Sequence, residues 1–288
     1  MNATALALVL TGAALHATWN YYAKKASGGL LFVWFYGWVS LALATPIALM
    51  VDLGDLGSLG PLAWLAITAS AVIHVVYSLV LQKGYRVADF SIVYPMARGT
   101  GPLFAVLAAV VLLGDRPSAT GWTAIAAIVG GIALIAAPAR RQTGTARIAL
   151  GVAWGAATGL CIAGYTVLDA WAVKTLAIAP LLYYLPSLAI RCLLIAPQAF
   201  AARHLWRAQW HEHRSAILVV GALSPLAYVL VLHAMQLAPL AYVAPAREVS
   251  MLIALLIGAR VLREALSPAR IAGTALMVGG VSLLALAR

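Results

Sequence analysis

Long apolar runs separated by short polar connections dominate the sequence. Four of these runs lie between the charged pairs Lys25–Asp52, Asp55–Lys83, Arg116–Arg140 and Arg147–Asp169, and each is longer than about 18 positions, the length typical of a helix that crosses a bilayer. With charges, prolines and glycines as boundaries, the pattern predicts ten transmembrane helices. They occupy residues 3–24, 29–51, 60–84, 89–113, 118–138, 147–173, 178–201, 215–236, 239–262 and 268–287.

The composition agrees with this pattern. Of 288 residues, 64% are hydrophobic and 9% are charged, whereas soluble domains carry about 25% charged residues. A soluble fold could not cover that much apolar surface, so the sequence predicts an all-α, multi-pass membrane protein. The net charge of +11 comes mainly from short connections between apolar runs, where membrane proteins carry their orientation signals. We therefore expect membrane lipid, and no nucleic acid, as a partner.

The second part of the chain repeats the first. Residues 112–135 align with 260–284 at a shift of 149, which superimposes the Gly-Gly pair of one on that of the other, and "VYPMAR" aligns with "YVAPAR". We interpret residues 1–138 and 148–288 as two five-helix repeats joined by a linker at 139–147. Because five is odd, the second repeat must enter the membrane in the opposite orientation, and a central cavity is expected between the two inverted repeats.

Lysine and arginine are distributed unequally over the connections. Those after the odd-numbered helices carry thirteen, and the other side carries three. The connection at 52–60 is acidic, whereas its counterpart at 203–214 is basic, as an inverted repeat requires. Under the positive-inside rule both termini lie on the same side, the periplasmic one.

Two arginines interrupt the apolar pattern. Arg98 and Arg247 each lie about eight residues inside the fourth helix of their repeat, near the middle of the hydrocarbon core. A charged group at that depth is costly and is a functional candidate by default. A proline shortly before each arginine removes a backbone hydrogen bond and frees carbonyl groups for a cavity. A purely structural role stays open, because Glu248 or Asp169 could neutralise an arginine.

Other polar and aromatic side chains recur at helical spacing. Residues four apart, such as His16 and Asn20, face the same way and could line a chamber, although interhelical hydrogen bonds or an interfacial aromatic belt are alternatives. The fifth and tenth helices are rich in small residues and are expected at the periphery. His211 and His213 are a weak metal signal, so we expect neither a metal nor a cofactor. The candidate substrate-binding residues are His16, Trp19, Asn20, His74, Tyr77, Ser78, Tyr94, Arg98, Tyr165, Tyr228, Tyr242, Arg247 and Glu248.

Three stretches resemble the drug/metabolite transporter superfamily and, within it, the EamA-type ten-helix exporters: "LHATWNYYAKKA" (15–26), "DFSIVYPMARGTGPLFAVLAAVVLLGDRPS" (89–118) and "YTVLDAWAVK" (165–174). The resemblance covers essentially the whole chain. It implies a bacterial inner-membrane exporter of small metabolites with helices 1, 3, 4, 6, 8 and 9 around the cavity. The aromatic lining is similar to what an exporter of aromatic amino acids would need. The first helix lacks the proton-coupling glutamate of small four-helix relatives.

Together these features predict an alternating-access exporter of amino acids, aromatic or large neutral ones. Arg98 would match the carboxylate of a zwitterion, while its ring would stack among Trp19, Tyr77 and Tyr94. Another cargo, such as a lipophilic cation, a drug or a sugar conjugate, is the main alternative. An enzyme is disfavoured because no nucleophile–His set or paired carboxylates share one depth, and a channel because no ring of repeated charges occurs. We expect a monomer or weak homodimer.

Overall fold

The described part of the chain is almost entirely helical. The computed structural model describes residues 1–26, 29–50, 56–88, 90–136, 145–253 and 268–286. Residues 249–253 are again helical after a turn at Glu248, and two short 3-10 turns occupy Leu56–Ser58 and Arg203–Leu205. The α-helices are α1 (Ala3–Ala26), α2 (Gly29–Met50), α3 (Pro61–Val87), α4 (Phe90–Leu112), α5 (Ala119–Ala136), α6 (Thr145–Lys174), α7 (Pro180–Ala201), α8 (Trp206–Leu237), α9 (Leu240–Arg247) and α11 (Pro268–Leu286).

Several of these helices suit a membrane by length and composition. Two shorter helices, Ala119–Leu134 and Ile271–Leu284, are also apolar. Apolar helices satisfy all their backbone groups internally, which is what lipid requires. Within the described residues, six helical segments are long and apolar enough to cross a bilayer, namely Gly29–Met50, Pro61–Val87, Ile92–Leu112, Ile148–Lys174, Pro180–Ala201 and Arg203–Leu237.

The helix boundaries follow the predictions, with two differences. Helix α8 begins at Trp206 rather than at residue 215, because the charged and aromatic stretch before the apolar run is itself helical. The predicted ninth helix is broken at Glu248. Its predicted end, 254–262, and most of the predicted linker, 139–144, lie outside the described residues.

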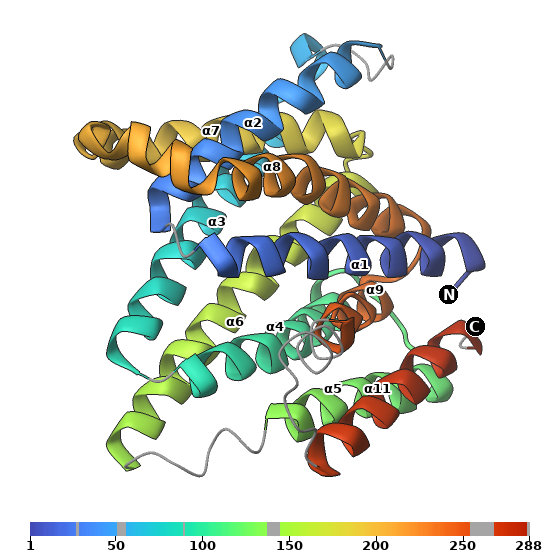
Figure 1. Ribbon diagram of the computed structural model, residues 1–288. Coiled ribbons are helices and arrows are strands. Elements are labelled where there is room, and N and C mark those ends of the chain that lie inside the picture. Colours follow the sequence, from blue (N-terminus) through green and yellow to red (C-terminus); the bar gives the residue numbers. More distant parts are fainter. Residues whose placement is uncertain (27–28, 51–55, 89, 137–144, 254–267, 287–288) are drawn as a thin grey trace.

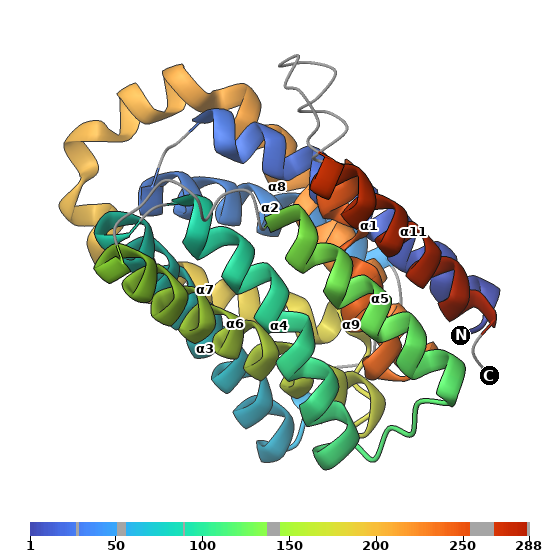
Figure 2. The same cartoon turned by 90° about the horizontal axis from the view of Figure 1, so that it is seen from below.

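Eight helices follow one another in a closed ring. Contacts link α3 to α6, α6 to α4, α4 to α9 and α9 to α1, and then α1 to α8, α8 to α2, α2 to α7 and α7 back to α3 (Figure 1). Helices α5 and α11 lie outside this ring and pack mainly on each other (Figures 1 and 2). Their place agrees with the periphery predicted for the fifth and tenth helices.

Glycines bring α4 and α6 into close contact. Gly151, Gly155 and Gly159 are spaced four apart along α6 and form one stripe. A side-chain carbon at Gly155 would lie 2.9 Å from the carbonyl oxygen of Val93, and one at Gly159 would lie 2.9 Å from the amide nitrogen of Gly101. Backbone atoms cannot move aside as a flexible side chain can. Small residues at such spacing allow membrane helices to pack backbone to backbone, so this stripe fixes one wall of the ring.

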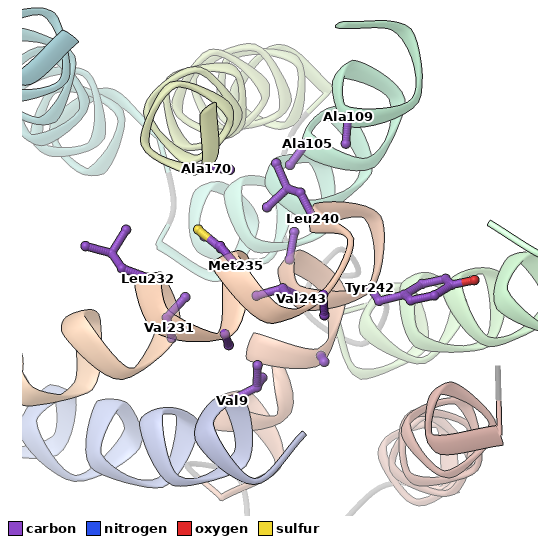
Figure 3. Packing of buried hydrophobic residues seen from close by; sticks show 14 of the residues in the cluster. Val9, Ala105, Ala109, Ala170, Val231, Leu232, Met235, Leu240, Tyr242 and Val243 are labelled. Atoms are coloured by element: carbon purple, nitrogen blue, oxygen red, sulfur yellow. The ribbon is translucent and has the colours of Figure 1, made fainter. Parts of the chain in front are cut away.

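Small aliphatic side chains fill the region where α9 meets its neighbours. The first half of α9, around Leu240 and Val243, is buried against α4 and α8. Figure 3 shows Val231, Leu232 and Met235 of α8 grouped beside it. The amino group of Met1 bonds to the carbonyl oxygen of Leu284 at 3.3 Å, so the start of α1 and the end of α11 are adjacent (Figure 1).

Candidate functional site

The ring of eight helices encloses a cavity of about 180 Å³. Every helix of the ring contributes to its wall, whereas neither α5 nor α11 does. The resemblance implied six lining helices, and the structure adds α2 and α7. Ten of the thirteen predicted residues line the cavity, namely His16, Trp19, Asn20, His74, Tyr77, Ser78, Arg98, Tyr165, Tyr228 and Arg247.

Arg98 and Arg247 meet at one carboxylate. Glu248 is buried, and its Oε2 lies 3.5 Å from Nη1 of Arg98 while its Oε1 lies 3.7 Å from Nε of Arg247. Arg98 also donates from Nη2 to Nε2 of His16 on α1 at 3.1 Å. Its guanidinium carbon lies 5.5 Å from the centre of the Tyr94 ring, one helical turn earlier. The cluster therefore links α1, α4 and α9, and Arg98 is already engaged on several sides.

Arg247 and Glu248 lie at a break in the helix, shortly after Pro245. Pro245 has no amide hydrogen, so the carbonyl of Ala241 loses its helical donor. The amide of Glu248 bonds instead to the carbonyl oxygen of Pro245 at 3.1 Å, and the amide of Met251 bonds to Glu248 at 2.8 Å. These tighter three-residue bonds interrupt the α-helix. The break places two consecutive charged side chains beside the cavity.

Aromatic rings form a second part of the wall. The imidazole of His74 stacks on the Tyr165 ring at 3.9 Å between centroids, and Tyr77 meets Tyr165 edge-on at 5.9 Å. Tyr228 lies beside both His74 and Tyr184, at 5.9 and 5.6 Å. Offset and edge-on contacts of this kind hold rings in fixed positions. The cavity therefore offers rigid aromatic faces to a bound molecule.

Asp169 holds this aromatic wall in place from the side that faces away from the cavity. Its carboxylate is fully buried on α6. Oδ1 accepts hydrogen bonds from the hydroxyls of Ser70 at 2.5 Å and Tyr183 at 2.6 Å, and Oδ2 accepts one from Tyr228. These donors come from α3, α7 and α8, so one carboxylate connects four helices. No arginine among the described residues lies within 4.0 Å of Asp169, so of the two carboxylates considered from the sequence Glu248 is the one in contact with arginines.

Arg191 is a cavity residue that the sequence analysis missed. It lies on α7 beside Tyr184 and Cys192, and Tyr36 of α2 lines the same cavity. The guanidinium carbon is 5.4 Å from the centre of the Tyr184 ring. A charge in the middle of an apolar helix was the available signal. The helix is continuous from Pro180 to Ala201.

Three predicted residues do not line the cavity. Tyr94 and Glu248 contact Arg98, which lines the cavity, but do not line it themselves. Tyr242 lies away from the cavity, and its hydroxyl accepts a hydrogen bond from the amide of Ser118 at 3.1 Å. Figure 3 shows its ring directed toward α5 and away from α8. The cause is helical geometry: Tyr242 precedes Arg247 by five residues, which is about 140° around the helix.

The family assignment follows from comparison with known sequences. The profile of the EamA-like transporter family matches residues 3–137 and, a second time, residues 149–286. The chain belongs to the EamA-like transporter family. Together with its apolar helices, this membership makes the chain a multi-pass membrane transporter. No curated protein matches it with significance.

A solved structure supports the fold of this EamA-like transporter. That structure, described only as the crystal structure of a protein, is 14% identical in sequence and has a TM-score of 0.76. The match covers 99% of this chain and 98% of the other. At that identity the likeness concerns the fold alone.

The cavity of this EamA-like transporter offers side chains that can bind a molecule through aromatic contacts and positive charge. Its walls combine aromatic faces with three guanidinium groups, from Arg98, Arg191 and Arg247. Within the described part of the chain, no three His, Cys, Asp or Glu residues are grouped as metal ligands. His213, one of the two histidines considered for a metal, packs edge-on against Phe32 at 6.4 Å and lies 3.8 Å from Glu212.

Proposed function

We propose that the chain is an alternating-access exporter of the bacterial inner membrane that moves amino acids with aromatic or other large neutral side chains. The observation that carries the proposal is the cavity, which combines aromatic rings and guanidinium groups on all eight helices of the ring. A guanidinium is a planar donor that matches a carboxylate, and aromatic faces accept rings and ammonium groups.

The size of the cavity is compatible with such a cargo. Apolar protein cavities of about 150 Å³ hold benzene, so about 180 Å³ of free space accommodates an aromatic ring. The positive charge of three arginines argues against the main alternative, a lipophilic cation.

Two inverted repeats, 1–138 and 148–288, would account for alternating access, since ten crossings in two halves of opposite orientation can exchange conformations. The unequal loop charges support this topology. Single cysteines at Ser58 and Arg207, which lie in corresponding connections of the two repeats, should be labelled from opposite sides of the membrane by an impermeant maleimide in a background without Cys161 and Cys192. Labelling of both from the same side would refute the topology.

The cargo is tested by counterflow in proteoliposomes. Vesicles loaded with unlabelled phenylalanine should accumulate labelled phenylalanine from outside, and tryptophan and leucine should compete with it. Empty vesicles are the control for leakage. Accumulation that is blocked by tetraphenylphosphonium or a sugar phosphate, but not by amino acids, would contradict the amino-acid proposal and favour the other cargo.

A further inference from the structure

Arg191 differs from the other two arginines of the cavity in its surroundings. It lies eleven residues from the start of the 22-residue helix α7, so it is near the middle of the apolar span. Its Nε donates to the backbone carbonyl of Ser187 at 3.4 Å, and the Tyr184 ring lies on its other side. Neither neighbour carries a negative charge. Among the described residues, no carboxylate lies within 4.0 Å of Arg191.

Arg98 and Arg247, in contrast, already share Glu248 at 3.5 and 3.7 Å. Asp169 attracts Arg191 from a distance, but its oxygens accept hydrogen bonds from three hydroxyls and lie more than 4.0 Å from the guanidinium. Burying a cation without a carboxylate in direct contact is costly inside a membrane protein. An anion that enters the cavity would supply the contacting negative charge that the protein itself does not provide to Arg191. A guanidinium has five N–H donors, of which one is directed to Ser187.

Residues of α7 present Arg191 to the cavity on one helical face. Tyr184, Leu188, Cys192 and Ile195 recur on this face at spacings of three and four residues and line the same cavity. Leu188 and Ile195 supply apolar surface on either side of the guanidinium along the helix. A molecule with an apolar ring and a carboxylate could therefore place both groups on α7 at once.

We infer that Arg191, and not Arg98, binds the carboxylate of the cargo, with its ring packed along Tyr184 and Leu188. This inference rests on the proposed function for the identity of the cargo. The contact is lost when the cargo lacks a carboxylate, and it does not depend on an ammonium group. The protein should therefore also bind an aromatic acid that has no amine.

The test uses three aromatic probes of similar shape on detergent-purified full-length protein at constant chloride concentration. They are 3-phenylpropionate (carboxylate only), phenylalanine (both groups) and phenethylamine (amine only), and binding is measured by calorimetry. The wild type should bind the first two. Arg191→Gln should weaken both at least tenfold, since hydrogen bonds to a charged group are among the strongest in proteins. Arg191→Lys should keep an intermediate affinity because it keeps the charge. The exposed Arg207→Gln is the matched control and should bind like the wild type.

The outcomes separate the inference from the proposed function. If Arg191→Gln and Arg191→Lys, eluting as monodisperse protein, bind 3-phenylpropionate as the wild type does, the inference is wrong. The same holds if the wild type binds phenethylamine alone, or none of the probes. If 3-phenylpropionate binding depends on Arg191 while labelled phenylalanine shows no counterflow, the anion site at Arg191 is confirmed. The proposal that the cargo is an amino acid is then wrong.

Discussion

Replacing Glu248 by glutamine should destabilise the protein strongly, because this one carboxylate faces two guanidinium groups. Its side chain is 1% exposed, and those of Arg98 and Arg247 are 12% and 8% exposed. The amide of glutamine has nearly the same shape as the carboxylate, so packing is kept while the charge is removed. The two arginines would then remain in the same buried cluster with no counter-charge from Glu248.

The magnitude follows from the distances. With an effective dielectric constant of about 20, two unit charges at 3.5 to 3.7 Å attract each other by roughly 4 to 5 kcal/mol. Desolvation offsets part of this attraction, and removing one partner of a buried pair costs about 3–5 kcal/mol in practice. We expect a loss in that range for Glu248→Gln. On the scale of folded domains, such a loss lowers the melting temperature by on the order of 10 °C.

The assay is thermal unfolding of purified protein in detergent, followed by intrinsic tryptophan fluorescence. Glu212→Gln is the matched control, because Glu212 is 73% exposed and lies 3.8 Å from a histidine. Arg247→Gln combined with Glu248→Gln should recover part of the loss, since only one buried cation then remains unpaired. If Glu248→Gln melts within about 2 °C of the Glu212→Gln protein, the cluster does not stabilise the fold in the way argued here.

Three further changes test other parts of the structure. Asp169→Ala should lower the melting temperature more than Asp169→Asn, because alanine leaves three hydroxyl donors without their acceptor, at roughly 1–3 kcal/mol for each that stays unpaired. Gly155→Ile should prevent α4 and α6 from packing and yield little monodisperse protein, whereas Gly279→Ile, where nothing lies within 4 Å, should be tolerated; equal yields would contradict the close-packing argument. Tyr242→Phe should leave counterflow unchanged and cost about 0.5–1.5 kcal/mol of stability through the bond to Ser118, and a loss of counterflow at full stability would return Tyr242 to the site.

The sequence predicts the helices well because a segment surrounded by lipid must be both apolar and hydrogen-bonded within itself. A helix in hydrocarbon needs a long apolar run, so the run marks the helix. Outside lipid that link is lost, and helix α8 extends through "WRAQWHEHR" (206–214), where polar side chains are no obstacle to helical bonding. The internal prolines of α7, Pro186 and Pro197, likewise leave that helix continuous. Polar composition predicts where a membrane span ends, which is not always where its helix ends.

The candidate site is predicted where symmetry repeats and is missed where it does not. Arg98 and Arg247 are found because the two halves carry the same residue at a shift of 149. At that shift the counterpart of Arg191 is Ala42 (191 minus 149), so no repeat draws attention to it. Tyr242, in contrast, is included because it is near Arg247 in the sequence, but it lies on another face of α9. The position of a residue along the sequence indicates how deep it lies in the membrane, but not on which side of its helix the side chain lies.

Several charged residues at the site have no charged counterpart at the corresponding position of the other half. At the shift of 149, Glu248 corresponds to Gly99 and Asp169 to Asn20, so the two carboxylates that contact cavity residues belong to the second half. One of them faces the two symmetric arginines, and the other accepts hydrogen bonds from three hydroxyls. The third arginine, also in the second half, has no carboxylate within 4.0 Å among the described residues. The two family matches of the chain therefore differ where the charges lie, and it is to the second of them that we assign the cation that receives an anion.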